Sequence, residues 1–231
     1  MKSIILDLCG GSGAWSKPYK DAGYTVINCT LPDIDICETL IYDDYMALRN
    51  KNAHYTPHIY HSNVIGILAA PPCTEFSLAK NGSHRSRDIA KGMETVEACM
   101  KIIWAVQKFG KLEFWALENP RGLLRRFLGK PAYTFKQWQF GEPRVKATDI
   151  WGYFNVPTPT VNERPHGLTV RLSNGQMQGL DWTKLCYPDE YKEYIDAIKG
   201  WDNKRAAARA ITPAGFAKAF FKANSRRIAN E

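Results

Sequence analysis

Cys73 stands directly behind two prolines, at the end of an apolar run and before a polar, basic loop, in the stretch "AAPPCTEFS" (69–77). The prolines stiffen the backbone that carries the thiol. At the carboxyl end of a central strand, where open α/β sheets bind their ligands, a thiol with a lowered pKa is a candidate nucleophile. Packing alone is the alternative interpretation, because cysteine is among the most buried residue types.

Glu118 has a comparable place in "LENP" (117–120), at the end of another apolar stretch. If both stretches form neighbouring strands, the carboxyl group and the Cys73 thiol leave the sheet at the same edge. Together they would make a nucleophile with an acid partner. A lone acid that caps a strand end is the alternative interpretation.

The glycine-rich turn "DLCGGSG" (7–13) is a third candidate, since it directly follows an apolar run. Glycines let a ligand approach the backbone, and a helix behind the turn offers unpaired N–H groups. The pattern is neither GxGxxG nor the phosphate loop with its GK[ST], which argues against a dinucleotide or a triphosphate. A small adenosyl ligand whose charge is not phosphate fits better.

The elements that must position these residues follow from the apolar pattern. We predict strands at 3–8, 24–31, 64–70, 113–120, 134–140 and 147–154. We predict helices at 17–23, 88–109 and 121–129. A strand, a glycine turn, a helix and a second strand in succession are typical of a doubly wound sheet. The expected fold class is therefore α/β, with a mostly parallel sheet and helices on both faces.

The texture of the chain changes near residue 155. A stretch rich in Pro, Gly and Asn follows, and helical patterns return at 188–201 and within 203–228. We therefore predict a main unit (1–154), a small loop-rich insertion (155–203) and a C-terminal helix that returns to the main unit (204–231).

Composition limits the possible functions. The 231 residues suffice for one sizeable α/β domain, and the net charge of +8 (pI about 9.1) favours a polyanionic partner, nucleic acid first. The six cysteines are scattered without a CxxC pair, which argues against a metal site. The sequence shows no signal peptide and no membrane span, so we expect a cytoplasmic monomer with free thiols.

Five motifs occur together in a fixed order: "LDLCGGSGAWS" (6–16), "PPCTEFS" (71–77), "LENP" (117–120), "FGEPRVKATDIWG" (140–152) and "ITPAGFAKAF" (211–220). In order and spacing they resemble the cytosine-5 DNA methyltransferases, particularly the compact members that phages and prophages carry. The resemblance covers residues 3–154 and about 205–223, roughly three quarters of the chain. The motifs are specific in combination, although none would be alone.

The resemblance implies a Rossmann-like methyltransferase fold, the cofactor S-adenosyl-L-methionine, and DNA as partner. Cys73 resembles the thiolate that attacks C6 of a cytosine, and Glu118 resembles the carboxyl group that holds ring N3 and the amino group. The target base would be flipped out of the duplex. Units 1–154 and 155–203 would be the catalytic domain and the target-recognition region. Protection of phage or host DNA from restriction is the implied role.

The cofactor-binding residues implied by the resemblance are Asp7, Leu8, Cys9, Gly10, Gly11, Ser12, Gly13, Asp33 and Pro71. The chain departs from the family where an acid usually contacts the cofactor ribose, because Leu31 stands there. Asp33 and Asp35 lie just beyond and are candidate replacements. Asp43 or Asp44 is a weaker candidate for the adenine amino group.

A second departure concerns the family motif QxRxR, which appears here as Arg144-Val-Lys146-Ala-Thr148. Thr148 stands where the family has the arginine that touches the cytosine carbonyl oxygen. Lys146 or Arg144 would supply the positive charge, and we prefer Lys146, because it falls on the other arginine of the motif. Thr74 replaces the glutamine that usually follows the PPC cysteine.

DNA contacts are expected from the basic loop 80–92, which corresponds to a segment that closes over DNA in the family. A solvated basic loop is the alternative. The residues expected to bind substrate or DNA are Pro72, Ser77, Lys80, His84, Arg85, Arg87, Asn119, Arg164 and Arg171. The target-recognition region is short, so we expect a short or relaxed target sequence, read by side chains such as Arg164, His166, Arg171 and Asn174.

Two other functions remain open at this point. Thr148 and Leu31, where the family has charged groups, are compatible with a methyltransferase-like protein that binds DNA without turnover. The short recognition region is compatible with an enzyme that acts on RNA or a free cytosine nucleotide.

Overall fold

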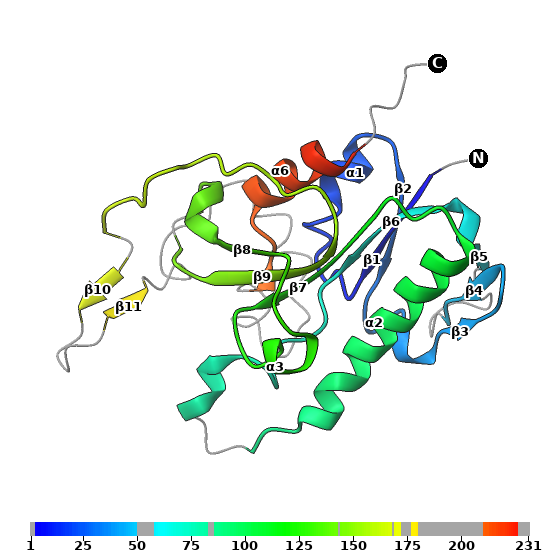
Figure 1. Cartoon of the computed structure of the whole chain (residues 1–231), viewed down its shortest axis with the longest axis horizontal. Coiled ribbons are helices and arrows are strands. Elements are labelled where there is room, and N and C mark those ends of the chain that lie inside the picture. Colours follow the sequence, from blue (N-terminus) through cyan, green and yellow to red (C-terminus); the bar gives the residue numbers. More distant parts are fainter. Residues whose placement is uncertain are drawn as a thin grey trace.

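The computed structural model describes residues 3–49, 58–82, 86–142, 144–167, 169–171, 177–179 and 210–225. A six-stranded sheet with the order β2-β1-β6-β7-β9-β8 forms its centre (Figure 1). The strands are β1 (Ile4–Leu8), β2 (Thr25–Cys29), β6 (Val64–Ala69), β7 (Phe114–Pro120), β8 (Tyr133–Lys136) and β9 (Ala147–Tyr153). β2, β1, β6 and β7 run parallel, whereas β9 is antiparallel to both its neighbours. The predicted α/β class with a mostly parallel sheet is confirmed, and the sheet is compatible with a Rossmann-like fold.

The central strands form because their apolar runs are buried on both faces of the sheet. β6 lies between β1 and β7, and five of its six residues are buried. Gly66 in this strand makes room for a neighbouring ring, because a Cβ atom there would lie 2.2 Å from Cζ of Phe114. Any larger residue at Gly66 would therefore displace the buried ring of Phe114.

Helix α2 (Ile89–Phe109) covers one face of this sheet (Figure 1). Its buried residues recur at spacings of three and four, at Val96, Cys99, Ile103 and Val106. This spacing places them on one side of the helix, where they join the core formed by β1 and β6. The predicted helix over 88–109 is thus confirmed.

Helices α1 (Lys17–Asp21) and α6 (Ala214–Asn224) lie on the opposite face (Figure 1). Aromatic rings join α6 to this face: Phe216 stacks on Phe135 of β8 with centroids 4.1 Å apart, and Phe220 meets Trp15 at 5.4 Å. Helices on both faces are therefore confirmed. The three-unit division stays a prediction, and the helix predicted at 188–201 lies outside the described residues.

Several short elements were not predicted. A separate three-stranded sheet consists of β3 (Leu40–Ile41), β4 (Tyr45–Ala47) and β5 (His58–Tyr60). Within the loop-rich stretch, β10 (Thr169–Arg171) and β11 (Met177–Gly179) form a hairpin. By contrast, helix α3 (Arg125–Leu128) corresponds to the helix predicted at 121–129, and it covers only four of those residues. Single 3-10 turns occur at Ile36–Glu38, His61–Asn63, Leu78–Gly82 and Gln137–Phe140.

The predicted strand 134–140 is wrong in its second half. After β8 ends at Lys136, the chain enters the 3-10 turn 137–140 and reverses at Gly141, whose φ is 87°. The reversal is held by backbone bonds from Gln137 N to Lys146 O (3.1 Å) and from Trp138 N to Arg144 O (3.0 Å). Glycine is suited to this left-handed conformation, because it has no Cβ atom to clash.

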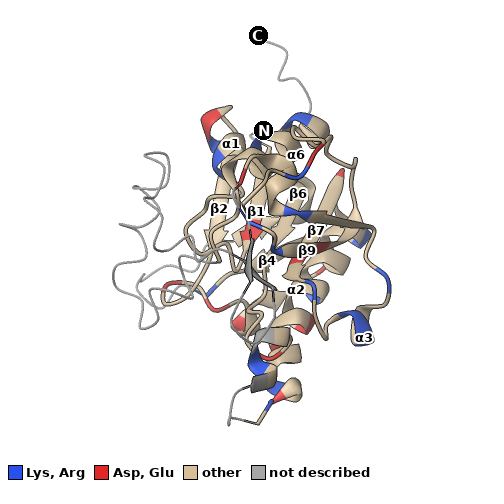
Figure 2. Cartoon of the chain, turned by 90° about the vertical axis from the view of Figure 1, so that its left-hand side faces the viewer, with Lys and Arg blue, Asp and Glu red and all other residues tan. Residues whose placement is uncertain are grey.

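Basic residues are distributed over α1, α3 and α6 (Figure 2). Among the described residues, no helix combines the length and the apolar character that a membrane crossing requires.

Candidate active site

The turn that carries Cys73 (residues 71–77, here called the Cys73 turn) follows β6 after one intervening residue and is anchored to β7. The amide of Asn119 donates from Nδ2 to the carbonyl oxygen of Pro71 at 3.0 Å, and both groups are buried. Beyond the thiol, the N–H groups of Phe76 and Ser77 both donate to the carbonyl oxygen of Cys73, at 3.0 and 2.8 Å. Pro71 and Asn119 are thus part of the support of the turn, and the Cys73 side chain lies half-buried on it.

Three predicted site residues meet at one edge of the sheet. Because β6 pairs in parallel with β7, Ala69 lies opposite Leu117, and Cys73 and Glu118 follow at the same edge. Lys146 directly precedes β9, the antiparallel neighbour of β7. Lys146 and Glu118 both lie close enough to Cys73 to act on its ionisation.

Burial has the largest effect on the ionisation of Cys73 and Glu118. Burial raises the pKa of the Cys73 thiol; the positive charge of Lys146 opposes this rise, and the negative charge of Glu118 adds to it. It also raises the pKa of the Glu118 carboxyl, again opposed by Lys146 and reinforced by Asp149. The lowered thiol pKa expected at Cys73 is therefore wrong for this structure, because loss of solvent outweighs the positive charge nearby. Lys146 is the group that favours the thiolate.

Arg144 and Thr148, the other two catalytic candidates in the segment 144–148, are buried. The Arg144 side chain is 6% exposed and its Nη2 lies 3.7 Å from Oε2 of Glu142. Thr148 lies opposite Pro120 of β7, and its Oγ1 has no hydrogen-bond partner among the described residues. The preference for Lys146 over Arg144 as the cation near the thiol agrees with this arrangement.

Asp7, the last but one residue of β1, is a fully buried carboxyl group. The hydroxyl of Ser16 donates to its Oδ2 at 2.5 Å, and its Oδ1 has no hydrogen-bond partner among the described residues. Burial raises the pKa of Asp7 to about 7, against the opposing effect of the Ser16 hydrogen bond. A buried carboxylate oxygen without a partner, beside a turn, fits a ligand that carries positive charge, as S-adenosylmethionine does.

The glycine turn itself is tightly built. Cys9 has a left-handed backbone with φ of 56°. A Cβ atom on Gly10 would lie 2.3 Å from Cγ of Asp7 and 2.6 Å from Oδ1 of Asn28. Asn28 also donates from Nδ2 to the carbonyl oxygen of Gly11 at 3.1 Å. Only glycine fits at position 10, so the sequence feature has a steric reason.

The expectation of unpaired helix N–H groups behind this turn is not met at the positions described. Helix α1 has five residues and begins at Lys17, whose N–H donates to the carbonyl oxygen of Gly13 (2.9 Å). The N–H of Gly13 in turn donates to the carbonyl oxygen of Gly10 (2.9 Å).

Two other predicted cofactor-binding residues differ in burial. Leu8 is fully buried and its carbonyl oxygen accepts from Ala70 N, whereas Ser12 is partly exposed in the turn.

The loop after β2 carries the candidate ribose ligands. Leu31 is 57% exposed, and Asp33 is exposed as well. Asp35 has a local role, because its Oδ1 accepts from the N–H of Cys37 at 3.1 Å and caps the turn 36–38. Asp33 stays the predicted ribose ligand.

Lys80 and Arg87, both predicted to bind DNA, make contacts within the chain. Lys80 pairs with the carboxylate of Glu75, and Arg87 donates to backbone carbonyl oxygens of Glu75 (2.6 Å) and Ser77 (2.8 Å). Ser77 also forms an isolated bridge with Gly122. Glu75 was not singled out in the sequence; its spacing of two residues from the cysteine and five from a lysine was the available signal.

The other predicted DNA-binding residues are spread out. Pro72 is exposed beside Cys73, and Arg164 and His166 are exposed in the loop after β9. Arg171 lies on β10, with its side chain outside the described part of the structure. His84, Arg85 and Asn174 also lie outside the described residues. Their contacts with DNA stay predictions.

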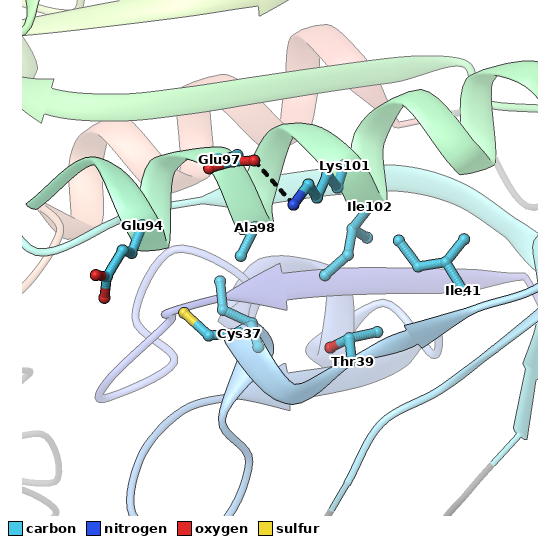
Figure 3. A pocket seen from close by; sticks show the side chains of 9 residues that line it. Cys37, Thr39, Ile41, Glu94, Glu97, Ala98, Lys101 and Ile102 are labelled. Carbon is cyan, nitrogen blue, oxygen red and sulfur yellow. Dashed lines mark ion pairs between the residues drawn. The ribbon is translucent and has the colours of Figure 1, made fainter. Parts of the chain in front are cut away.

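A groove of about 310 Å³ lies elsewhere, between the segment 36–41 and helix α2 (Figure 3). Cys37 and Thr39 face Glu94, Glu97 and Lys101 across it. It contains none of the predicted site residues, so we do not assign the reaction to it.

A comparison with protein-family models gives no match, and a comparison with curated proteins gives none either. In the described ranges, no group of three or more His, Cys, Asp or Glu side chains is arranged to hold a metal ion.

Proposed function

We propose that this chain is an S-adenosylmethionine-dependent methyltransferase that acts on C5 of cytosine in DNA. One observation carries the proposal: three adjacent parallel strands bring the candidate groups to the same edge of the sheet. The glycine turn follows β1, the Cys73 turn follows β6, and Glu118 lies near the end of β7. The registers Leu8 opposite Ala69 and Ala69 opposite Leu117 bring these three ends side by side. Ligands of open α/β sheets bind at this edge.

Cys73 would act as the nucleophile. Its sulfur forms a bond to C6 of the cytosine, and the electron pair of the C5–C6 double bond makes C5 nucleophilic. After C5 has accepted the methyl group, a base removes the C5 proton, the electrons of the C5–H bond restore the C5–C6 double bond, and the S–C6 bond breaks with its electrons returning to the Cys73 thiolate. Lys146 favours the thiolate that starts this sequence.

Glu118 would hold the ring. Because burial raises its pKa, the carboxyl group retains a proton more readily than an exposed glutamate does. A neutral carboxyl donates one hydrogen bond, here to ring N3, and accepts another from the amino group. Withdrawal of electrons through N3 makes C6 more open to attack by the thiolate.

The glycine turn and Asp7 would hold the cofactor, which supplies an electrophilic methyl group from its sulfonium. Asp7 offers an unpartnered carboxylate oxygen, and Gly10, where any side chain would collide with Asp7 and Asn28, lets the turn pack closely on that carboxyl group. The Oγ1 of Thr148 on β9, also without a hydrogen-bond partner in the described region, would donate to the cytosine carbonyl oxygen. Both are groups that a ligand would satisfy.

The test is a trapping experiment with duplex DNA that contains 5-fluorocytosine, in the presence of S-adenosylmethionine. A base can remove a proton from C5 but cannot remove fluorine, so the elimination is blocked and the Cys73–C6 bond persists. We expect an adduct that survives denaturation in the wild type and is absent in Cys73→Ser. Cofactor binding without an adduct on varied-sequence DNA would contradict the proposal.

Binding without turnover is the second candidate, and the raised pKa of the Cys73 thiol favours it, because a protonated thiol is a poor nucleophile. This candidate predicts a stable complex with DNA and no transfer of a radiolabelled methyl group. Parallel assays on RNA and on free cytosine nucleotide separate the third function, an enzyme with another substrate, from both.

A further inference from the structure

Glu75, two residues beyond Cys73, has an unusually large number of polar partners for a turn residue. Its Oε2 accepts from the ammonium of Lys80 and from the backbone N–H of Asp88 at 2.8 Å. The side chains of Glu75 and Lys80 are only 17% and 14% exposed. The pair is therefore shielded from solvent, and loss of one partner leaves a poorly solvated charge.

The backbone of Glu75 is held as well. Arg87 donates from Nη1 to the carbonyl oxygen of Glu75 at 2.6 Å. The other terminal nitrogen of Arg87 reaches the carbonyl oxygen of Ser77 (2.8 Å) and Oδ1 of Asn81 (2.6 Å). One guanidinium thus spans the backbone on both sides of Phe76.

These contacts tie the turn to a long helix. Asp88 directly precedes α2, and its side chain caps the helix by accepting from Lys91 N at 3.0 Å. One turn into α2, a Cβ atom on Gly92 would lie 2.9 Å from Cβ of Glu75. Glycine at 92 therefore lets the helix pack directly on Glu75, and the 21-residue helix serves as a rigid support.

We propose that Glu75 is a positioning residue that fixes the Cys73 turn on α2 and so sets the orientation of the Cys73 thiol. The link between them is short, because the N–H groups of Phe76 and Ser77 both donate to the carbonyl oxygen of Cys73. The role of the thiol in methyl transfer rests on the proposed function, whereas its orientation by Glu75 does not.

In this arrangement Lys80 and Arg87 have a structural role within the protein. The sequence analysis predicted that both bind DNA, but Lys80 pairs with the carboxylate of Glu75 and Arg87 donates to its carbonyl oxygen. They hold the turn from one side, while Asn119 holds it from the other through Pro71.

The test measures the alkylation rate of Cys73 by iodoacetamide, followed by mass spectrometry of the peptides. Cys29 and Cys99 are fully buried and serve as internal controls for the integrity of the fold. The variants are Glu75→Ala, which removes all side-chain contacts, and Glu75→Gln, which keeps an oxygen that accepts from Asp88 N. Glu97→Ala is the matched control. It removes a solvent-exposed Glu–Lys pair from α2, the helix on which Glu75 packs, in which Glu97 lies 2.8 Å from Lys101.

We expect Glu75→Ala to accelerate alkylation of Cys73 by at least about fivefold, because the turn opens locally. Cys29 and Cys99 stay protected, Glu75→Gln lies in between, and Glu97→Ala matches the wild type. An unchanged Cys73 rate would overturn the positioning role. Equal deprotection of Cys29 and Cys99 would also overturn it, because Glu75 would then only stabilise the whole fold.

Methyl transfer provides a second readout. We expect kcat to fall about tenfold or more in Glu75→Ala, while KM for S-adenosylmethionine changes by less than about twofold, because the nucleophile is misplaced and the glycine turn is untouched. Methyl transfer by Glu75→Ala at the wild-type kcat would count against the role. A wild type that transfers no methyl group refutes the proposed function instead, and the alkylation rates still decide on Glu75.

Discussion

Asn119 Nδ2 donates a hydrogen bond to the carbonyl oxygen of Pro71, at 3.0 Å between two buried groups. The two residues are 48 positions apart in the chain: Pro71 follows the end of β6, and Asn119 lies in the last part of the neighbouring strand β7. This bond joins the PPC and ENP motifs to each other. The spacing of Cys73 and Glu118 across the sheet therefore depends on the side-chain amide of the residue that directly follows Glu118.

The first prediction concerns this bond. Asn119→Ala leaves the buried carbonyl oxygen of Pro71 without its donor, which should lower the free energy of unfolding by about 1–3 kcal/mol. Urea denaturation at neutral pH measures the loss. Asn119→Asp keeps the size but replaces the donor with a charge, so its loss should be larger. An Asn119→Ala variant as stable as the wild type would show that the bond contributes nothing.

The sequence predicted the central part of the fold because its pattern there is long and unambiguous. β6 and α2 are defined by a continuous apolar run and by apolar residues at helical spacing. The sheet formed by β3, β4 and β5 escaped notice because strands of two or three residues carry too little pattern. The turn at 137–140 was also missed, since its direction depends on backbone bonds to Lys146 and Arg144, distant partners that no local pattern reports.

The second prediction tests the effect of Lys146 on the thiol. Its charge lowers the pKa of Cys73, so Lys146→Met should raise that pKa further and move the pH dependence of Cys73 alkylation to higher pH. At a fixed pH below the pKa, alkylation should slow by at least about threefold. Lys146→Arg keeps the charge and serves as the control. A profile that does not move in Lys146→Met would exclude the interaction.

Glu118→Gln should shift the pKa of Cys73 in the direction opposite to Lys146→Met, and the same alkylation measurement detects the shift. The carboxylate adds to the rise of the pKa of Cys73, so its removal should move the alkylation profile to lower pH. A shift to higher pH would mean that Glu118 acts on Cys73 by something other than its charge.

The candidate site was predictable in its members and less so in their environment. Strand ends and motif order were enough to place Cys73 and Glu118 at one edge, because parallel strands share that edge. The sequence did not reveal that burial raises the pKa of both groups, since burial is set by segments far apart in the chain. Glu75 was overlooked for a similar reason: its partner Asp88 is thirteen residues away, on the far side of the basic loop.

The third prediction is a pH dependence of stability that Asp7 causes. Its pKa is about 7 in the folded chain and 3.8 for an unperturbed side chain, so the folded state binds the proton more tightly. Folding therefore takes up a proton between these values, and this group's contribution to stability falls as the pH rises from about 4 to about 7. Asn cannot titrate, so the free energy of unfolding of Asp7→Asn, relative to that of the wild type, should increase by up to about 4 kcal/mol as the pH rises across that window. Urea denaturation of both proteins at a series of pH values measures the difference, and a constant difference would contradict the shift.

The fourth prediction concerns the ion pair that fixes α3 on the sheet. Asp149 of β9 is fully buried, and Arg125 binds both its oxygens, with Nε–Oδ2 at 2.6 Å and Nη2–Oδ1 at 2.5 Å. Thr134 adds a hydrogen bond to Oδ1 at 2.8 Å. Arg125→Met leaves the buried carboxylate without its counter-charge, and the unfolding free energy should fall by about 2–4 kcal/mol.

A double-mutant cycle separates the loss of the pair from the cost of the stranded charge. Asp149→Asn removes that charge, so the double variant Arg125→Met/Asp149→Asn should be at least about 1 kcal/mol more stable than Arg125→Met alone. Arg126→Met is the matched control, since Arg126 is exposed on the same helix, and it should match the wild type within about 0.5 kcal/mol. Asp149 also raises the pKa of Glu118, so Asp149→Asn should lower it and weaken the tendency of Glu118 to keep its proton. If the double variant is no more stable than Arg125→Met, the carboxylate is solvated once the arginine is gone, and the pair stabilises through packing of the arginine stem.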